Sequence, residues 1–219
     1  MNRLAVFDCD GTLVDSQATI CRAMADGFAA CGLPGPADAA TRGIIGLSLV
    51  EAMAALHPTG TAAQHAVLAD EYKKAFFNLR AAGLAEEPLY DGITEAIRDL
   101  DERGWLLGVA TGKSDRGLKH ILEHHGLHPK FVTLQTADRH PSKPHPSMLE
   151  LAMAEAGAGP TTTAMIGDTS YDMMMAKAAG CAAIGVAWGY HGSRELIEGG
   201  ADVVAESPGA LVAILEALP

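Results

Sequence analysis

Short apolar runs alternate with helix-like segments through the second half of this chain, and this alternation restricts the fold more than any other feature. Runs with strand character lie at 4–7, 106–111, 131–136, 163–166, 182–187 and 202–204. Helical patterns cover 93–103, 116–125, 146–156, 171–179 and 209–218. Strands separated by helices are typical of βαβ units, which place parallel strands between two layers of helices. We therefore predict an α/β fold built on a Rossmann-like open parallel sheet.

The segment from 16 to 86 has a different character, because it contains no convincing strand. Gly and Pro clusters at 32–36 and 57–60 and the single Gly83 divide it into several helices. We predict a helical domain of residues 16–86 inserted into an α/β domain made of residues 1–15 and 87–219. With 219 residues, of which 48% are hydrophobic, the chain is long enough for one core and such an insertion.

The overall charge of the chain limits its partners. A formal net charge of -11 disfavours binding to nucleic acid or an anionic membrane, since both need clustered Lys and Arg. The four cysteines have no C-x-x-C spacing, which favours reduced, structural thiols. No apolar stretch reaches membrane-spanning length, and no secretory leader is recognisable. We expect a cytoplasmic monomer or homodimer without nucleic-acid or membrane partners.

Two carboxylates follow the first predicted strand directly, in the segment Asp8-Cys9-Asp10-Gly11-Thr12. In open parallel sheets, ligands bind at the carboxyl ends of the strands. The one-residue spacing lets Asp8 and Asp10 face one site while Cys9 points elsewhere. Taken alone, the pair is explained equally well by a solvated acidic turn.

Two later strand ends carry groups that suit an anionic ligand. Thr111 and Gly112 offer a hydroxyl and a backbone N–H just before a helix. Lys143 precedes Pro144, which disfavours helical backbone at the lysine and holds it extended. Taken singly, the first site also reads as a helix N-cap at Ser114 or Asp115, and Lys143 as a solvated loop residue.

The fourth strand end adds two more carboxylates, Asp168 and Asp172, at the start of a helix. Helix capping and the helix dipole explain either residue alone. The parallel topology, however, collects all these strand ends at one edge: Asp8, Asp10, Thr111, Lys143, Asp168 and Asp172. Crowded carboxylates repel one another unless a hard cation joins them, and Mg²⁺ binds carboxylate, carbonyl and phosphate oxygens. The pattern therefore predicts a Mg²⁺ site beside a phosphate site.

The order D-x-D-G-T, T-G-K, K-P and G-D-x-x-x-D resembles the haloacid dehalogenase superfamily. The helical insertion is similar to the type 1 cap of that family, and the layout is similar to phosphoglycolate phosphatases. This resemblance implies a Mg²⁺-dependent phosphatase that acts on a small phosphorylated metabolite, phosphoglycolate-like or a sugar phosphate. It also implies an aspartyl-phosphate intermediate.

The resemblance implies roles for individual residues. Asp8 would be the nucleophile, and Asp10 the general acid that later acts as the base. The carboxylates of Asp8 and Asp168 and the backbone carbonyl of Asp10 would hold Mg²⁺, while Asp172 would act through a metal-bound water or by orienting Lys143. Charge on the phosphoryl oxygens would be neutralised by Thr111, the Gly112 N–H and Lys143.

Departures from the family patterns separate the alternatives. Dehalogenases lack the second aspartate, so Asp10 favours phosphoryl chemistry. Mutases with this cap carry a His about where this chain has Ile20, which weighs against a phosphosugar mutase. A non-catalytic phospho-ligand-binding protein on the same fold would lack a catalytic residue, and none is missing. The second motif commonly has Asn in place of Gly112.

One loop of the predicted cap is a candidate for substrate recognition. Gly43 and Gly46 within the segment 42–48 permit unusual backbone geometry. Arg42 and Ser48 are the candidates for binding the remote polar end of a substrate. An ordinary turn between helices explains the segment equally well.

Overall fold

The computed structural model describes residues 1–218, and its centre is one sheet of six parallel strands. The order across the sheet is β3-β2-β1-β4-β5-β6. The strands are β1 (Asn2–Phe7), β2 (Leu106–Thr111), β3 (Phe131–Thr136), β4 (Ala158–Gly167), β5 (Ala182–Val186) and β6 (Val203–Ala205). The predicted parallel α/β fold is confirmed.

The sequence prediction missed the beginning of β4, which starts at Ala158 rather than at Thr163. Its first residues are half-buried or exposed, and the pairing with β1 shifts register between Asn2 and Leu4. The stretch Gly-Pro-Thr-Thr therefore lacks the apolar signal of a buried strand, which begins only where β4 enters the core.

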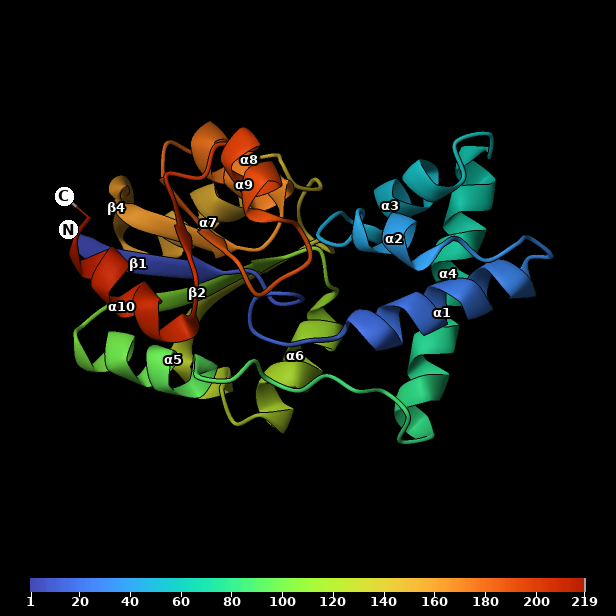
Figure 1. The fold of residues 1–219 in the computed structure, drawn as a ribbon, viewed down its shortest axis with the longest axis horizontal. Coiled ribbons are helices and arrows are strands. Elements are labelled where there is room, and N and C mark those ends of the chain that lie inside the picture. Colours follow the sequence, from blue (N-terminus) through green and yellow to red (C-terminus); the bar gives the residue numbers. More distant parts are fainter. Residues whose placement is uncertain (219) are drawn as a thin grey trace.

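Helices cover both faces of the sheet, as the upper and lower layers of Figure 1 show. One face carries α5 (Ile93–Glu102), α6 (Asp115–His124) and α10 (Pro208–Glu216), whose apolar residues pack with Ala5 and Phe7 of β1. The other carries α7 (Ser147–Ala156), α8 (Ser170–Ala178) and α9 (Ser193–Glu198), packed with Leu4 and Val6. Successive residues of β1 thus point into two apolar clusters, which explains why its run is continuously apolar.

Two short helical elements were not predicted. The 3-10 helix η1 (His128–Lys130) leads into β3, and α9 has six residues of which only Leu196 is buried. One buried position in less than two turns gives no helical periodicity to read.

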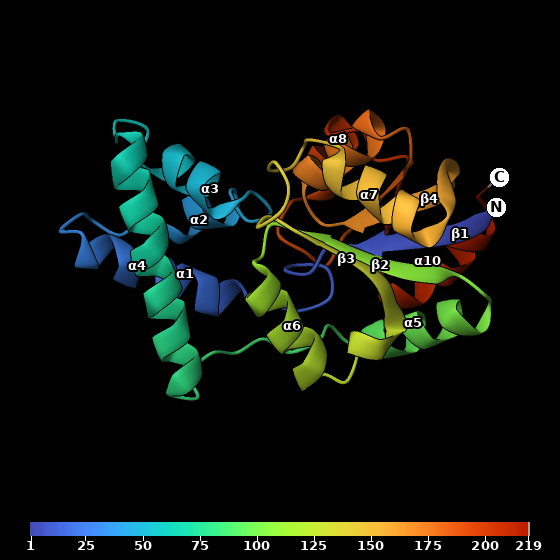
Figure 2. The same ribbon diagram turned by 180° about the vertical axis from the view of Figure 1, so that it is seen from behind.

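The remaining helices form a group beyond the carboxyl ends of the strands, seen on the left in Figure 2. They are α1 (Gln17–Ala30), α2 (Asp38–Arg42), α3 (Leu49–Leu56) and α4 (Ala62–Ala81). The crossing of α1 and α4 depends on Gly27, since a Cβ there would lie 2.9 Å from the Tyr72 backbone nitrogen. Residues 16–86 contribute no strand.

Membrane-spanning character is absent from the helices of residues 1–218, none of which is both long and apolar enough to cross a bilayer.

Candidate active site

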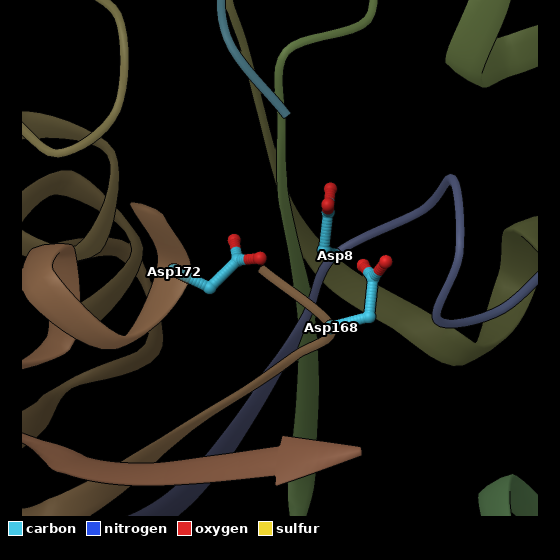
Figure 3. A group of neighbouring side chains, drawn as sticks. All are labelled: Asp8, Asp168 and Asp172. Atoms are coloured by element: carbon cyan, nitrogen blue, oxygen red, sulfur yellow. The ribbon is translucent and has the colours of Figure 1, made fainter. Parts of the chain in front are cut away.

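Three predicted carboxylates meet at the carboxyl ends of β1 and β4. Asp8 directly follows β1, Asp168 directly follows β4, and Asp172 lies in the first turn of α8. Because β1 and β4 pair with Phe7 opposite Ile166, the two strand ends are adjacent. All three side chains are buried, each offers an oxygen within 4.8 Å of the others, and Figure 3 shows them around one point.

Asp8 is held at one oxygen and free at the other. Its Oδ1 accepts a hydrogen bond from the Cys9 backbone N–H at 2.7 Å and lies 2.9 Å from Lys143 Nζ. Its Oδ2 is buried and has no hydrogen-bond partner among residues 1–218. Burial raises the pKa of the Asp8 carboxyl to about 7, against the lowering effect of Lys143 and with a further increase from Asp172.

Asp168 is fixed by groups that come from distant parts of the chain. The Thr12 hydroxyl donates to its Oδ1 at 3.1 Å, and the Tyr190 backbone N–H donates to its Oδ2 at 2.9 Å. Burial, followed by the negative charges of Asp8 and Asp172, raises the pKa of Asp168 well above its ordinary value. This carboxylate is therefore well oriented, but within residues 1–218 it forms no ion pair.

Lys143 is the one buried cation between the carboxylates in the described chain. Its Nζ donates to Asp172 Oδ1 at 2.6 Å and also contacts Asp8. Burial alone would lower the pKa of Lys143, but Asp172 and Asp8 outweigh burial and raise it. The second oxygen of Asp172 accepts hydrogen bonds from the Thr169 N–H and hydroxyl at 3.1 and 2.7 Å. One oxygen of Asp172 is thus bound to Lys143 and the other to Thr169.

This donor set fits a hard divalent cation. Among residues 1–218, the three buried carboxylates have one buried ammonium group beside them, which pairs with Asp8 and Asp172, so negative charge is in excess in a place from which water is largely removed. The Asp8 carboxylate and the oriented Asp168 carboxylate supply the kind of oxygen ligands that such cations take.

Asp10 has a different environment from Asp8. Lys113 Nζ donates to both of its oxygens, at 2.5 and 2.7 Å, and the Ser16 hydroxyl donates to Oδ1. Lys113 also lies 3.7 Å from Glu87 Oε1, at the point where the chain returns from α4 toward α5. Asp10 is thus a nearly buried carboxylate that accepts hydrogen bonds at both oxygens. It does not belong to the group of three carboxylates formed by Asp8, Asp168 and Asp172.

Lys113 was not among the predicted site residues. Its place at the same strand end as Thr111 and Gly112 was the one sequence feature that could have identified it as a site residue. A lysine after a glycine, however, is usually a solvated loop residue. Thr111 is buried at the end of β2, and its hydroxyl accepts from the Lys113 N–H at 3.3 Å.

The 43–48 loop lies directly over the end of β2. The Ser48 N–H donates to the Ser142 hydroxyl at 2.7 Å, and the Tyr171 hydroxyl donates to the Gly43 carbonyl at 3.2 Å. A Cβ at Gly112 would lie 2.5 Å from the Leu47 carbonyl oxygen. The glycine that replaces the commoner Asn therefore makes room for this loop.

A cavity of about 750 Å³ lies between the α1–α4 helices and the sheet edge. Asp8, Asp10, Thr111, Gly112 and Ser48 all line it. Arg42, the other predicted substrate-binding residue, is the last residue of α2 and is not part of the lining of this cavity.

Comparison with known proteins agrees with the motifs. Residues 5–186 match the family described as haloacid dehalogenase-like hydrolase. The chain belongs to this family. It is 36% identical to the probable phosphatase IndB of Dickeya dadantii over all of this chain and 95% of that protein. It is 28% identical to a phosphoglycolate phosphatase of Vibrio vulnificus, over 97% of this chain and 96% of that protein.

Solved structures of the family have the same architecture. A predicted phosphatase from Clostridium acetobutylicum superposes with a TM-score of 0.88 at 27% identity, over 99% of both chains. The protein is a phosphatase of the haloacid dehalogenase-like family.

Proposed function

We propose that this phosphatase hydrolyses the phosphomonoester of a small metabolite with the help of Mg²⁺, through an aspartyl-phosphate on Asp8. One observation carries the proposal: Asp8 lines the cavity with one oxygen held by Lys143 and the other, Oδ2, buried without a hydrogen-bond partner. A carboxylate oxygen in that state keeps a free lone pair for attack on phosphorus.

In the first step, Asp8 Oδ2 attacks phosphorus and the bond from phosphorus to the ester oxygen breaks. Asp10 donates a proton to that oxygen, so the leaving group departs as a neutral alcohol. Lys113 and Ser16 hold Asp10 in place for this transfer.

In the second step, water attacks the phosphorus of the aspartyl-phosphate. Asp10, now deprotonated, takes the proton of the water, and the bond from phosphorus to the Asp8 oxygen breaks. Inorganic phosphate leaves, the Asp8 carboxylate is restored, and Asp10 is again protonated.

Charge on the transferring group is balanced by Lys143, the Thr111 hydroxyl and the Gly112 N–H. The carboxylates of Asp8 and Asp168 and the Asp10 carbonyl would hold Mg²⁺, which when bound would supply positive charge beside the phosphoryl oxygens. Asp172 serves this arrangement by fixing Lys143.

The division into residues 1–15 and 87–219 as the catalytic domain and 16–86 as a cap stays a prediction. We propose that the cap opens for substrate and product and closes over Asp8 through the 43–48 loop. The contacts of Ser48 with Ser142 and of Tyr171 with Gly43 support this role, because they join the two parts at the cavity.

The test is Asp8→Asn, which keeps the shape of the side chain and removes its nucleophilic oxygen. Mg²⁺-dependent phosphate release should fall by about a thousandfold or more, with an unchanged melting temperature. The matched control is Asp26→Asn, an exposed carboxylate of α1, which should keep full activity. Undiminished turnover of Asp8→Asn contradicts the proposal, and isomerised sugar phosphate in place of free phosphate indicates a mutase.

A further inference from the structure

The wall of the cavity that faces away from the sheet is built mainly from apolar side chains. They come from α1, the 43–48 loop and α4: Ile20, Met24, Ile45, Tyr72, Phe76 and Phe77. The volume of about 750 Å³ is that of a site for a drug-sized ligand, and a phosphate with a two-carbon acid fills only a small part of it.

The apolar wall reaches the place where the leaving alcohol takes its proton. Lys113 Nζ lies 2.5 Å from Asp10 Oδ1 and 5.6 Å from the centre of the Phe76 ring. Phe76 is nearly buried, with 8% of its surface exposed, so its ring is a fixed part of this wall. The Lys113 ammonium therefore contacts both Asp10 and the Phe76 ring, so the apolar wall begins one ammonium group away from Asp10.

The inner cations beside this wall already donate hydrogen bonds to acidic side chains. Lys113 is bound to both oxygens of Asp10. Arg80 donates two hydrogen bonds, at 2.9 and 2.8 Å, to Glu87. A carboxylate on the leaving group would have to break one of these pairs to gain a partner.

Two other cations line the cavity, Lys73 of α4 and Arg116 of α6, and both are exposed. Arg116 is exposed, and its guanidinium carbon lies 5.6 Å from the centre of the Phe77 ring. It can steer a phosphate monoester toward the cavity, but it is too exposed to replace the hydration of a second anionic group. Sugar hydroxyls would equally lose water against Ile20, Met24 and Ile45, which offer them no hydrogen-bond partner.

From this lining we infer that the substrate is the phosphate monoester of a bulky, predominantly apolar alcohol, such as one with an aromatic ring near the ester. This inference rests on the proposed function, because it takes Asp8 and Asp10 as the groups that face the phosphate. Glycolate is too charged, and hexoses are too rich in hydroxyl groups, to match this apolar wall.

Ethyl phosphate and 2-phenylethyl phosphate provide the direct test, because both release a primary alcohol and differ only by the phenyl ring. We expect a kcat/KM roughly 10- to 100-fold higher for 2-phenylethyl phosphate, the range that apolar pocket contacts supply. Phosphoglycolate and glucose phosphate should be no better than ethyl phosphate. All are measured with the wild-type chain and Mg²⁺ by release of inorganic phosphate.

Substitutions in α4 test whether the preference for 2-phenylethyl phosphate over ethyl phosphate arises from this apolar wall. Phe76→Leu should lower the ratio of the two kcat/KM values, and Phe77→Ala provides a second variant that is safe for folding because Phe77 is 56% exposed. Val67→Ala is the matched control: Val67 is 54% exposed on the same helix and does not line the cavity. It should leave the ratio unchanged.

The outcomes separate this inference from the proposed function. A preference for phosphoglycolate or glucose phosphate over 2-phenylethyl phosphate overturns the inference and leaves the phosphatase mechanism intact. Equal kcat/KM values for the ethyl and phenylethyl esters also overturn it. Absence of phosphate release from every ester, by contrast, contradicts the proposed function itself.

Discussion

At the scale of single residues, the two carboxylates of the first motif differ through their partners. Asp8 contacts Lys143 and keeps one oxygen free, whereas both oxygens of Asp10 are bound by Lys113. This difference in hydrogen-bond partners suits two carboxyl groups with different roles, Asp8 as the nucleophile and Asp10 as the acid. Lys113 is then a positioning residue for Asp10, because it binds both oxygens of that carboxylate.

Lys113→Met removes both contacts to Asp10 and should lower kcat by about 10- to 100-fold with a smaller change in KM, since Asp10 loses its orientation and not its chemistry. Lys113→Arg should restore part of the loss. The kcat/KM for an activated aryl phosphate, whose leaving group departs without a proton, should fall less than that for an alkyl phosphate.

Lys119→Met is the control for this prediction, because Lys119 is exposed on α6 and its ammonium group lies 3.8 Å from Glu123 Oε1. A purely structural role for Lys113 would lower both kcat/KM values equally and would lower the melting temperature as well.

The excess of negative charge around Asp8 and Asp168 predicts that Mg²⁺ stabilises the folded chain. At a hundredfold excess over its dissociation constant, the ion should contribute about 2.7 kcal/mol. For a chain of this size that is a rise in melting temperature of roughly 5–10 °C. Chelation of the metal should reverse the rise and abolish activity.

Asp168→Asn removes one ligand and should abolish the Mg²⁺-dependent shift, while Asp26→Asn should keep it. Calorimetry or a dye-based melt gives this readout without any activity measurement. Equal shifts in the wild type and Asp168→Asn would place the bound ion elsewhere.

At the scale of elements, the end of β2 and the 43–48 loop must fit together for the cavity to form. Gly112 has the Leu47 and Gly46 carbonyl oxygens 2.5 and 2.8 Å from the position of a Cβ, so even a methyl group forces the loop away. This contact also explains why Ser48 reaches the cavity. Its N–H is fixed to the Ser142 hydroxyl from the loop after β3.

Gly112→Ala should therefore impair cap closure and lower kcat/KM by about tenfold or more, since water is no longer excluded from the site. The melting temperature should change little, because the substitution lies outside the apolar clusters. Gly209→Ala, at a helix position where a Cβ meets nothing within 4 Å, is the control and should behave as the wild type. Full activity of Gly112→Ala would contradict the proposed closure.

At the scale of the whole molecule, the strand order explains which parts of the fold and the site could be predicted from the sequence. Continuous apolar runs predicted the central strands, and parallel topology predicted that their carboxyl ends meet. The structure places Asp8, Asp168, Asp172 and Lys143 together accordingly. Those predictions needed only the position of each residue at the end of a strand.

Contacts between the two parts of the chain could not be predicted in this way. The pairing of Lys113 with Asp10 depends on how the loop after β2 turns, and a solvated lysine has the same local sequence. Ser48 lines the cavity and Arg42 does not, and this difference depends on how the 43–48 loop packs against Gly112. Tertiary packing decides both, and local patterns carry no signal of it.

The central claim is that the phosphoryl group passes through Asp8, and chemical trapping tests it most directly. An aspartyl-phosphate is an acyl phosphate, which borohydride reduces to homoserine. Wild-type chain quenched during turnover and reduced should yield homoserine at position 8, and Asp8→Asn should yield none. Sustained phosphate release with no homoserine at position 8, or with homoserine at another aspartate, would contradict the mechanism.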